Sequence, residues 1–183
     1  MFWKNQDEVY IIAEAGDQHF GSLDTAFKLV DGAKNAGANC IKFQHHLPDE
    51  EMLPDVPMSS NFDQPLYEFL KENALNISQH KKVKDYCEKL NIDYLCTPFS
   101  LKAAHELLTI DVKFFKIGSG EMTDTPTVSA VADMGLPMIV STGMSTFEEI
   151  DRTYQLLIKK NIPIALMNCT SEYPPIYEDI NLK

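Results

Sequence analysis

Five short apolar runs in this chain each end in a polar or charged residue. They are residues 40–44, 94–98, 114–119, 138–142 and 165–170. A continuous apolar run of this length is typical of a parallel strand that is buried on both faces, where an unpaired ammonium group is costly. Lys42 and Lys116 lie within such runs and therefore require anions. Because parallel α/β folds bind ligands at the carboxyl ends of their strands, the pattern predicts one polar basin that holds an anionic small molecule.

Helical patterns alternate with the apolar runs, which predicts a parallel α/β sheet, either doubly wound or closed into a barrel. The expected strands are residues 9–14, 40–44, 94–98, 114–118, 138–141 and 164–169. The expected helices are residues 23–36, 66–72, 78–89, 101–108, 126–134 and 146–160. Ser78 is the expected N-cap of its helix, and Thr146 with Glu149 predicts a capping box.

The sequence of the turn after the first strand distinguishes a doubly wound sheet from a barrel. It reads Gly16-Asp17-Gln18-His19-Phe20-Gly21, which lacks the Gly-x-Gly-x-x-Gly pattern of dinucleotide-binding sheets. Polar residues at the ends of many successive strands favour a TIM-type (β/α)8 barrel. About six strands are visible where such a barrel has eight. We therefore expect residues 1–183 to form a single partial barrel domain and to be a fragment of a longer gene product.

Charge and hydropathy narrow the class of protein. The formal net charge is -11, with 16 Lys and Arg against 27 Asp and Glu, so no basic surface for nucleic acid or anionic lipid is expected. No apolar run approaches the length of a membrane span, and the first seven residues lack a secretory signal pattern. These features predict a cytoplasmic protein that binds small molecules.

The four cysteines are expected to be reduced core residues. Cys40, Cys87, Cys96 and Cys169 show no Cys-x-x-Cys spacing, and three of them fall inside predicted strands. Buried free thiols are common in proteins of this kind. A disulfide or cysteine metal site is therefore not predicted.

Six motifs in order resemble those of the sialic acid synthases and their relatives that make legionaminic and pseudaminic acids. They are Ile11–Gly16, Ile41–Gln44, Thr97–Ser100, Phe115–Glu121, Ser141–Met144 and Cys169–Pro174. The resemblance implies a TIM-barrel domain that condenses phosphoenolpyruvate with an N-acetylmannosamine-type sugar and releases phosphate. It also implies a divalent metal, often manganese, whose histidine ligands lie beyond this chain, as does a small C-terminal antifreeze-like domain. The full-length protein is expected to be a homodimer.

The resemblance also implies roles for individual residues. Lys42 and Lys116 neutralise phosphoenolpyruvate, and a set of hydroxyls donates hydrogen bonds to its oxygens. These hydroxyls belong to Thr97, Ser119, Ser141 and Ser171. Gln44 and Tyr173 contact the sugar. Glu14 and Glu121 are the expected catalytic carboxylates, which position water or sugar hydroxyls and transfer protons.

Structural roles compete with these assignments. Lys42 could point outward, Glu14 and Glu121 could close salt bridges within the barrel, and residues 141–143 could cap the next helix. Adjacent histidines on one strand point apart, so we interpret His45 and His46 as loop residues rather than metal ligands. His19 lies where the family has Asn-His-Asn-Gly, a pattern that this chain only partly keeps. No metal ligand is assigned.

Two other functions stay open at this point. The chain could be a non-catalytic fragment that binds a phosphorylated ligand or a partner. It could also belong to another phosphoenolpyruvate or aldolase-type barrel, which keeps the lysines but not the segment from Cys169 to Pro174. We expect the 183-residue chain alone to be inactive, and the sialic, legionaminic and pseudaminic branches are all compatible with its motifs.

Overall fold

The protein is described here from a computed structural model, which covers residues 8–55, 58, 64–172 and 174–182. Contacts divide the chain into two compact units, Met1–Val112 and Lys113–Lys183. Each unit contains three parallel strands that alternate with helices. The alternation predicted from the sequence is therefore confirmed in both units.

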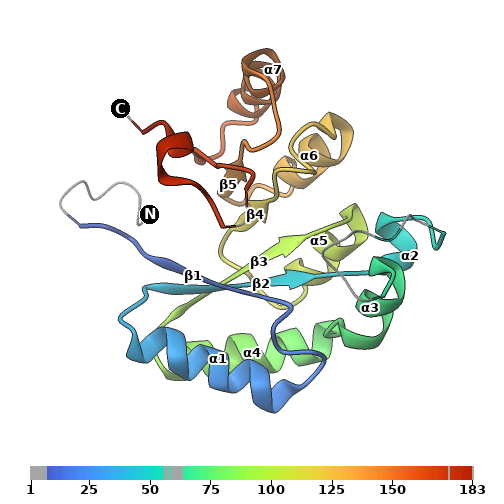
Figure 1. The fold of residues 1–183 in the computed structure, drawn as a ribbon, viewed down its shortest axis with the longest axis vertical. Coiled ribbons are helices and arrows are strands. Elements are labelled where there is room, and N and C mark those ends of the chain that lie inside the picture. Colours follow the sequence, from blue (N-terminus) through green and yellow to red (C-terminus); the bar gives the residue numbers. More distant parts are fainter. Residues whose placement is uncertain (1–7, 56–57, 59–63, 173, 183) are drawn as a thin grey trace. The chain divides into compact units, whose positions relative to one another are not determined.

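The first unit is a three-stranded parallel sheet with helices packed against it. Its elements are β1 (Ile12–Gly16), α1 (Leu23–Asn35), β2 (Cys40–His45), α2 (Pro48–Glu51), α3 (Leu66–Asn73), α4 (Ile77–Lys89), β3 (Asp93–Pro98) and α5 (Leu101–Leu108). β2 lies between β1 and β3, and α1 and α4 lie side by side along one face of this sheet (Figure 1). The register places Glu14 opposite Lys42 and Gln44 opposite Thr97.

The core of this unit follows from the apolar run of β2 and its neighbours. Ile41, Phe43 and Leu95 are almost completely buried. At α4 the predicted cap is wrong, because Asn76 rather than Ser78 is the N-cap. The Asn76 side chain accepts a hydrogen bond from the Gln79 backbone, and Gln79 returns one, so Ser78 lies within the first turn. The Ser78 hydroxyl donates to Asn76 instead.

The second unit repeats the strand and helix pattern. Its elements are β4 (Phe115–Ile117), α6 (Thr125–Ala132), β5 (Met138–Ser141), α7 (Phe147–Ile158), β6 (Ile164–Met167) and the short 3-10 helix η2 (Tyr177–Ile180). β5 pairs in parallel with both β4 and β6. α6 and α7 lie side by side (Figure 1), and the capping box of Thr146 and Glu149 is present as predicted.

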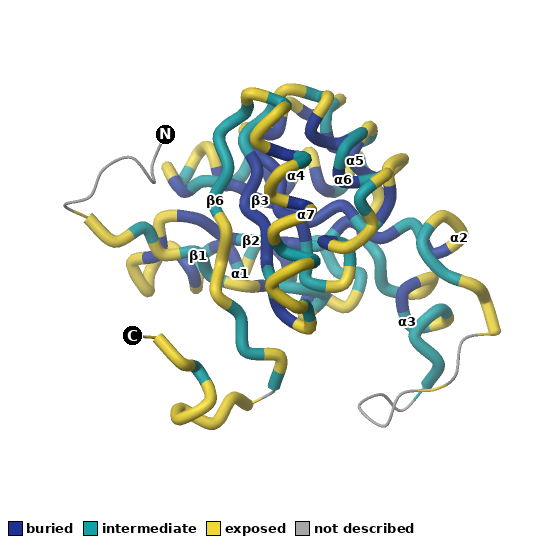
Figure 2. The backbone as a smooth tube through the Cα atoms, turned by 90° about the horizontal axis from the view of Figure 1, so that it is seen from above, coloured by how far each residue is buried: buried dark blue, intermediate teal, exposed yellow. Residues whose placement is uncertain are grey.

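β6 departs from the expected buried strand. It ends at Met167, and its apolar residues Leu166 and Met167 are 43% and 39% exposed (Figure 2). β6 pairs with β5, and its first two residues are half-buried whereas its last two are exposed. Cys169 follows the strand and is half-buried, whereas the other three cysteines are buried, and all four are free thiols.

Within the described ranges, none of the helices combines the length and the apolar character that crossing a bilayer requires.

Candidate functional site

In the first unit, Lys42 and Glu14 form an ion pair across β1 and β2. The side chain of Lys42 is only 12% exposed, so the outward-pointing alternative is wrong. Glu14 is half exposed, and its Oε1 also accepts a hydrogen bond from the Gly16 backbone N–H at 2.9 Å. The anion that Lys42 requires is thus supplied by the protein itself. This is the salt bridge expected as the alternative to catalysis for Glu14.

Gln44 lies two residues beyond Lys42, on the same face of β2. The Gln44 Nε2 and the Glu14 Oε1 both border the space over Gly16. A Cβ placed on Gly16 would lie 3.8 Å from the Gln44 Nε2 and 3.6 Å from the Glu14 Oε1. Thr97, opposite Gln44 in β3, is buried. The structure therefore brings Glu14, Lys42 and Gln44 together at the ends of their strands.

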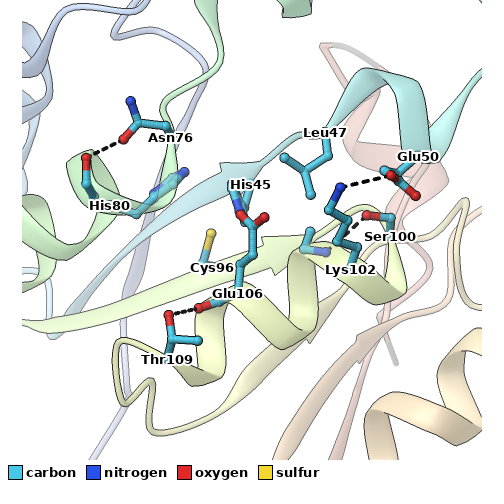
Figure 3. Close-up of polar contacts among 12 residues, drawn as sticks. His45, Leu47, Glu50, Asn76, His80, Cys96, Ser100, Lys102, Glu106 and Thr109 are labelled. Carbon is cyan, nitrogen blue, oxygen red and sulfur yellow. Dashed lines mark hydrogen bonds and ion pairs between the residues drawn. The ribbon is translucent and has the colours of Figure 1, made fainter.

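The two adjacent histidines are both buried. The interpretation as a loop residue is wrong for His45, which lies within β2, and is confirmed for His46, which follows the strand. His45 is the last residue of β2, and its Nε2 lies 2.8 Å from Glu106 Oε2, which reaches toward it from α5 (Figure 3). His46 follows directly, and its Nδ1 lies 2.7 Å from Glu51 Oε1. The strand alternation continues past Gln44, so His46 lies on the face of Lys42 and Gln44 while His45 faces the helices.

His46 is the histidine of this unit whose pKa is raised rather than lowered. Its Nε2 lies 3.0 Å from Gln44 Oε1 and 3.4 Å from Asp17 Oδ2. Burial alone lowers the pKa of His46, but its hydrogen bonds to Asp17 and Glu51 outweigh burial and raise the pKa to about 9. Sequence reasoning missed Asp17, His46 and Glu51. The sequence offered one signal for His46: it follows Gln44 by two residues, as Gln44 follows Lys42, which is the spacing of side chains on one face of a strand.

Three further histidines of this unit are buried in neutral form. Burial lowers the pKa of His19, His45 and His80, most strongly for His80. His80 Nδ1 is 2.8 Å from the Tyr94 hydroxyl. His19 Nδ1 accepts from the Gly21 N–H at 3.1 Å, which places the ring proton on Nε2, 3.7 Å from Asp17 Oδ1.

These neutral histidines predict that the chain loses stability in mild acid. The unfolded chain binds protons at histidine below a pH of about 6.5, whereas the folded chain with lowered pKa values does not. The free energy of unfolding should therefore fall as the pH decreases below about 6.5, by on the order of 1 kcal/mol per pH unit for each such histidine. Urea unfolding followed by circular dichroism between about pH 7 and about pH 5 measures this slope.

The variant His80→Gln should reduce the pH slope, because it removes a group that is fully buried in the folded chain. The matched control is His105→Gln on α5, where the side chain is exposed and the slope should stay as in the parent chain. Equal slopes for the parent and His80→Gln would contradict the assignment. His46 acts in the opposite sense, because its raised pKa adds stability that is complete below about pH 6.5 and is lost as the pH rises through about 9.

In the second unit, Lys116 is buried in the middle of β4, as predicted. Lys116 is 6% exposed, and its Nζ donates to Ser141 Oγ at 2.5 Å and to the Ile117 carbonyl at 2.7 Å. Ser141 is the last residue of β5. Because Ser141 accepts from Lys116, its own hydroxyl hydrogen remains to donate to another oxygen. A buried cation and a hydroxyl thus meet where β5 ends.

Two more predicted hydroxyls meet over Gly143. The Gly143 N–H donates to Ser119 Oγ at 3.1 Å. A Cβ at Gly143 would lie 2.9 Å from Ser119 Oγ and 2.5 Å from Ser171 Oγ, so a larger residue there would displace these hydroxyls. The capping alternative for residues 141–143 is wrong, since Thr146 is the N-cap of α7. The structure therefore brings Ser119 and Ser171 together.

Glu121 lies in the turn that follows β4 and is half-buried. Its carboxylate folds back over Gly118, where an added Cβ would collide with Glu121 Oε2, whereas a Cβ at Gly120 would meet no atom within 4 Å. Ser171 also lines an open groove of about 580 Å³ beside the start of α7. Tyr173, the second predicted sugar contact, lies outside the described residues.

The metal implied by the resemblance does not fit the described part of the chain. No group of three or more His, Cys, Asp and Glu side chains there could hold a metal ion. His45 and His46 contact different partners, Glu106 and Glu51. No catalytic step is therefore derived through a metal.

Comparison with known proteins gives a consistent result. Residues 29–183 match the NeuB family. The chain is 33% identical to the N-acetylneuraminate-9-phosphate synthase of Drosophila melanogaster, over 97% of this chain and 49% of that protein. It is 34% identical to the N,N'-diacetyllegionaminic acid synthase of Campylobacter jejuni, over 94% of this chain and 54% of that protein. The chain thus spans about half the length of the curated relatives it matches.

The fold is similar to that of a solved relative. The crystal structure of the N-acetylneuraminic acid synthetase of Leptospira borgpetersenii in complex with citrate matches with a TM-score of 0.86 and 31% identity, over 96% of this chain and 59% of that one. The α/β barrel class predicted from the sequence is thereby confirmed. The three parallel strands of each unit account for six of the eight in such a barrel.

Proposed function

Since this chain belongs to the NeuB family, we propose that it carries the phosphoenolpyruvate-binding part of an enzyme that condenses phosphoenolpyruvate with an N-acylated amino sugar to a nonulosonic acid. The observation that carries the proposal is the buried Lys116 ammonium beside the Ser141 hydroxyl. The names of the relatives, which make N-acetylneuraminate 9-phosphate and diacetyllegionaminic acid, support the sugar class. The citrate held by the Leptospira relative supports a site for a small anion.

Phosphoenolpyruvate carries a phosphate and a carboxylate, and the second unit offers groups for such charges. Lys116 supplies a buried positive charge, and the hydroxyls of Ser119, Ser141 and Ser171 supply donors. We also propose that Lys42, in the first unit, contributes a cation to phosphoenolpyruvate binding, and Glu14 pairs with it. The second unit by itself supplies a cation and hydroxyl donors for an anionic group.

The proposed reaction forms one carbon–carbon bond and one carbon–oxygen bond from water, and it breaks the carbon–oxygen bond to phosphate. The enol carbon of phosphoenolpyruvate attacks the aldehyde carbon of the open-chain sugar, whose oxygen takes up a proton. Water then adds to the resulting cationic carbon and loses a proton, and phosphate leaves from the tetrahedral intermediate. We assign these proton transfers to Glu14, within β1, and Glu121, in the turn after β4. Gln44 donates to a sugar oxygen through its amide nitrogen.

The remaining features of the whole enzyme are part of the same proposal. We expect a homodimer and a divalent metal, often manganese in this family, whose ligands lie outside the described residues. Phosphoenolpyruvate is an intermediate of cytoplasmic metabolism, so we place the reaction in the cytoplasm. We also propose that residues 1–183 belong to one barrel domain.

Titration calorimetry of this chain tests the proposed ligand. We expect phosphoenolpyruvate to bind more tightly than either inorganic phosphate or pyruvate, because each of these supplies only one of the two anionic groups. Affinity for phosphoenolpyruvate no higher than that for phosphate contradicts the proposal.

Phosphate release tests the proposed reaction. The protein that contains this chain should release phosphate from phosphoenolpyruvate only when an N-acylated mannosamine-type sugar is present, and the 183-residue chain alone should not. A colorimetric phosphate assay with and without N-acetylmannosamine makes the comparison. Release at an equal rate without the sugar would show a phosphatase rather than a condensing enzyme.

A further inference from the structure

We propose that His46 is a positioning residue whose imidazolium, held between Asp17 and Glu51, turns the Gln44 amide so that only its N–H groups face the ligand. Gln44 then favours a ligand that presents an oxygen able to accept a hydrogen bond. The inference deepens the proposed function, on which it rests for the assignment of Gln44 to the amino sugar.

The environment of His46 fixes its ring from several elements. His46 is 7% exposed, and its ring stacks on Phe99, which follows β3, with ring centroids 4.1 Å apart. Asp17 approaches from the turn after β1 and Glu51 from α2. The other neighbouring titratable groups are His19, His45 and His80, and burial keeps all three histidines neutral. The ring therefore has little freedom to rotate.

Both ring nitrogens of His46 face acceptors. Nδ1 lies 2.7 Å from Glu51 Oε1, and Nε2 lies between Gln44 Oε1 at 3.0 Å and Asp17 Oδ2 at 3.4 Å. A neutral imidazole would direct a nitrogen lone pair at one of these oxygens, whereas an imidazolium donates from both nitrogens. The geometry thus selects the charged ring, and the raised pKa of about 9 agrees with it.

This hydrogen bond settles the orientation of Gln44. Its carbonyl oxygen accepts from His46, so its amide nitrogen points toward the space over Gly16 that Glu14 also borders. Without the Nε2 proton, the amide gains by turning over, because its N–H group can then donate to the ring. The carbonyl oxygen would in that case face the Glu14 side and repel a ligand oxygen that has no hydrogen to donate, such as the carbonyl of an N-acyl group.

The orientation has a consequence for the ligand. A sugar hydroxyl or the carbonyl of an N-acyl group can accept from the Gln44 N–H, but the ammonium of a free amino sugar cannot. Discrimination of this kind is strong when a buried polar group is left unpaired by the wrong ligand. The site should therefore favour the acylated sugar over its deacylated form.

The test uses Glu51→Gln, which keeps the side-chain shape and removes one of the two carboxylates that hold the His46 charge. The matched control is Glu50→Gln, the neighbouring position, where the side chain is exposed and pairs with Lys102 at 3.0 Å (Figure 3). Both variants remove one negative charge from α2, but only Glu51 contacts His46.

Nitrogen-15 NMR of this chain measures, without any ligand, whether the Gln44 amide responds to the protonation of His46. We expect both His46 ring nitrogens to be protonated at neutral pH, and the Gln44 side-chain N–H resonances to shift together with the His46 titration near pH 9. In Glu51→Gln this shared titration should move to lower pH, and in Glu50→Gln it should stay unchanged. A neutral His46 at neutral pH, or Gln44 resonances that do not follow it, would overturn the proposal.

Kinetics of the protein that contains this chain separate the two proposals. Glu51→Gln should raise the KM for the N-acylated sugar by roughly tenfold at about pH 8, less at about pH 6, and leave the KM for phosphoenolpyruvate within about twofold. If the sugar is used but its KM in Glu51→Gln matches that of Glu50→Gln at both pH values, the His46 proposal is wrong. If no amino sugar is used while the NMR coupling is present, the proposed function fails and the positioning of Gln44 stands.

Discussion

Replacing Lys116 by alanine should weaken phosphoenolpyruvate binding by roughly 100-fold or more, whereas Lys116→Arg should cost distinctly less. The ammonium of Lys116 is buried and donates to Ser141, so its loss leaves the anionic ligand in a polar pocket without its cation. Arginine keeps the charge but does not fit the place of a compact ammonium group. Titration calorimetry of the variant chains measures both affinities.

Two controls make this result specific. Lys159→Ala removes an exposed cation at the end of α7 and should leave the affinity unchanged. Lys116→Met keeps much of the side-chain volume, so it should fold like the parent chain by thermal melting and still lose binding. Unchanged affinity in Lys116→Met would remove Lys116 from the proposed binding site.

Turnover should fall by about 100-fold or more in Glu121→Gln, in the protein that contains this chain, with phosphoenolpyruvate affinity nearly unchanged. Glutamine keeps the shape of the side chain that folds over Gly118 but cannot take up or release a proton. Steady-state kinetics give the turnover number, and calorimetry gives the affinity.

The matched control for Glu121 is Glu148→Gln, an exposed carboxylate in the first turn of α7, which should have full activity. A Glu121→Gln protein with the turnover of the parent would reduce Glu121 to a structural residue. A loss of phosphoenolpyruvate affinity in parallel with turnover would instead place Glu121 in ligand binding.

The strands were predictable because their signal is local. Apolar runs locate β2, β3, β4 and β5 to within one or two residues, and the capping box of Thr146 and Glu149 is a pattern of four consecutive residues. The same reasoning placed Lys116 inside the sheet, since its apolar neighbours leave it no exposed face.

The errors arose where partners come from distant parts of the chain. The environment of His46 depends on Asp17, Glu51 and Phe99, which come from three separate segments of the chain, and no local sequence pattern predicts this contact. The exposure of β6 depends on what packs over its two faces, a property that its own apolar sequence does not encode. The error at α4 has a local cause, because Asn76 and Ser78 are both good caps and the Gln79 side chain decides between them.

The ion pair between Glu14 and Lys42 has a consequence for the approach of an anion from solution. The two charges largely cancel, so an arriving anion meets a local dipole there rather than a net positive charge. At longer range it meets a polypeptide with a formal charge of -11, which repels it. Dissolved salt shortens the reach of that repulsion, to about 8 Å at physiological ionic strength. Encounter with an anionic substrate should therefore become faster as salt is added, the reverse of the behaviour of proteins that attract their substrates electrostatically.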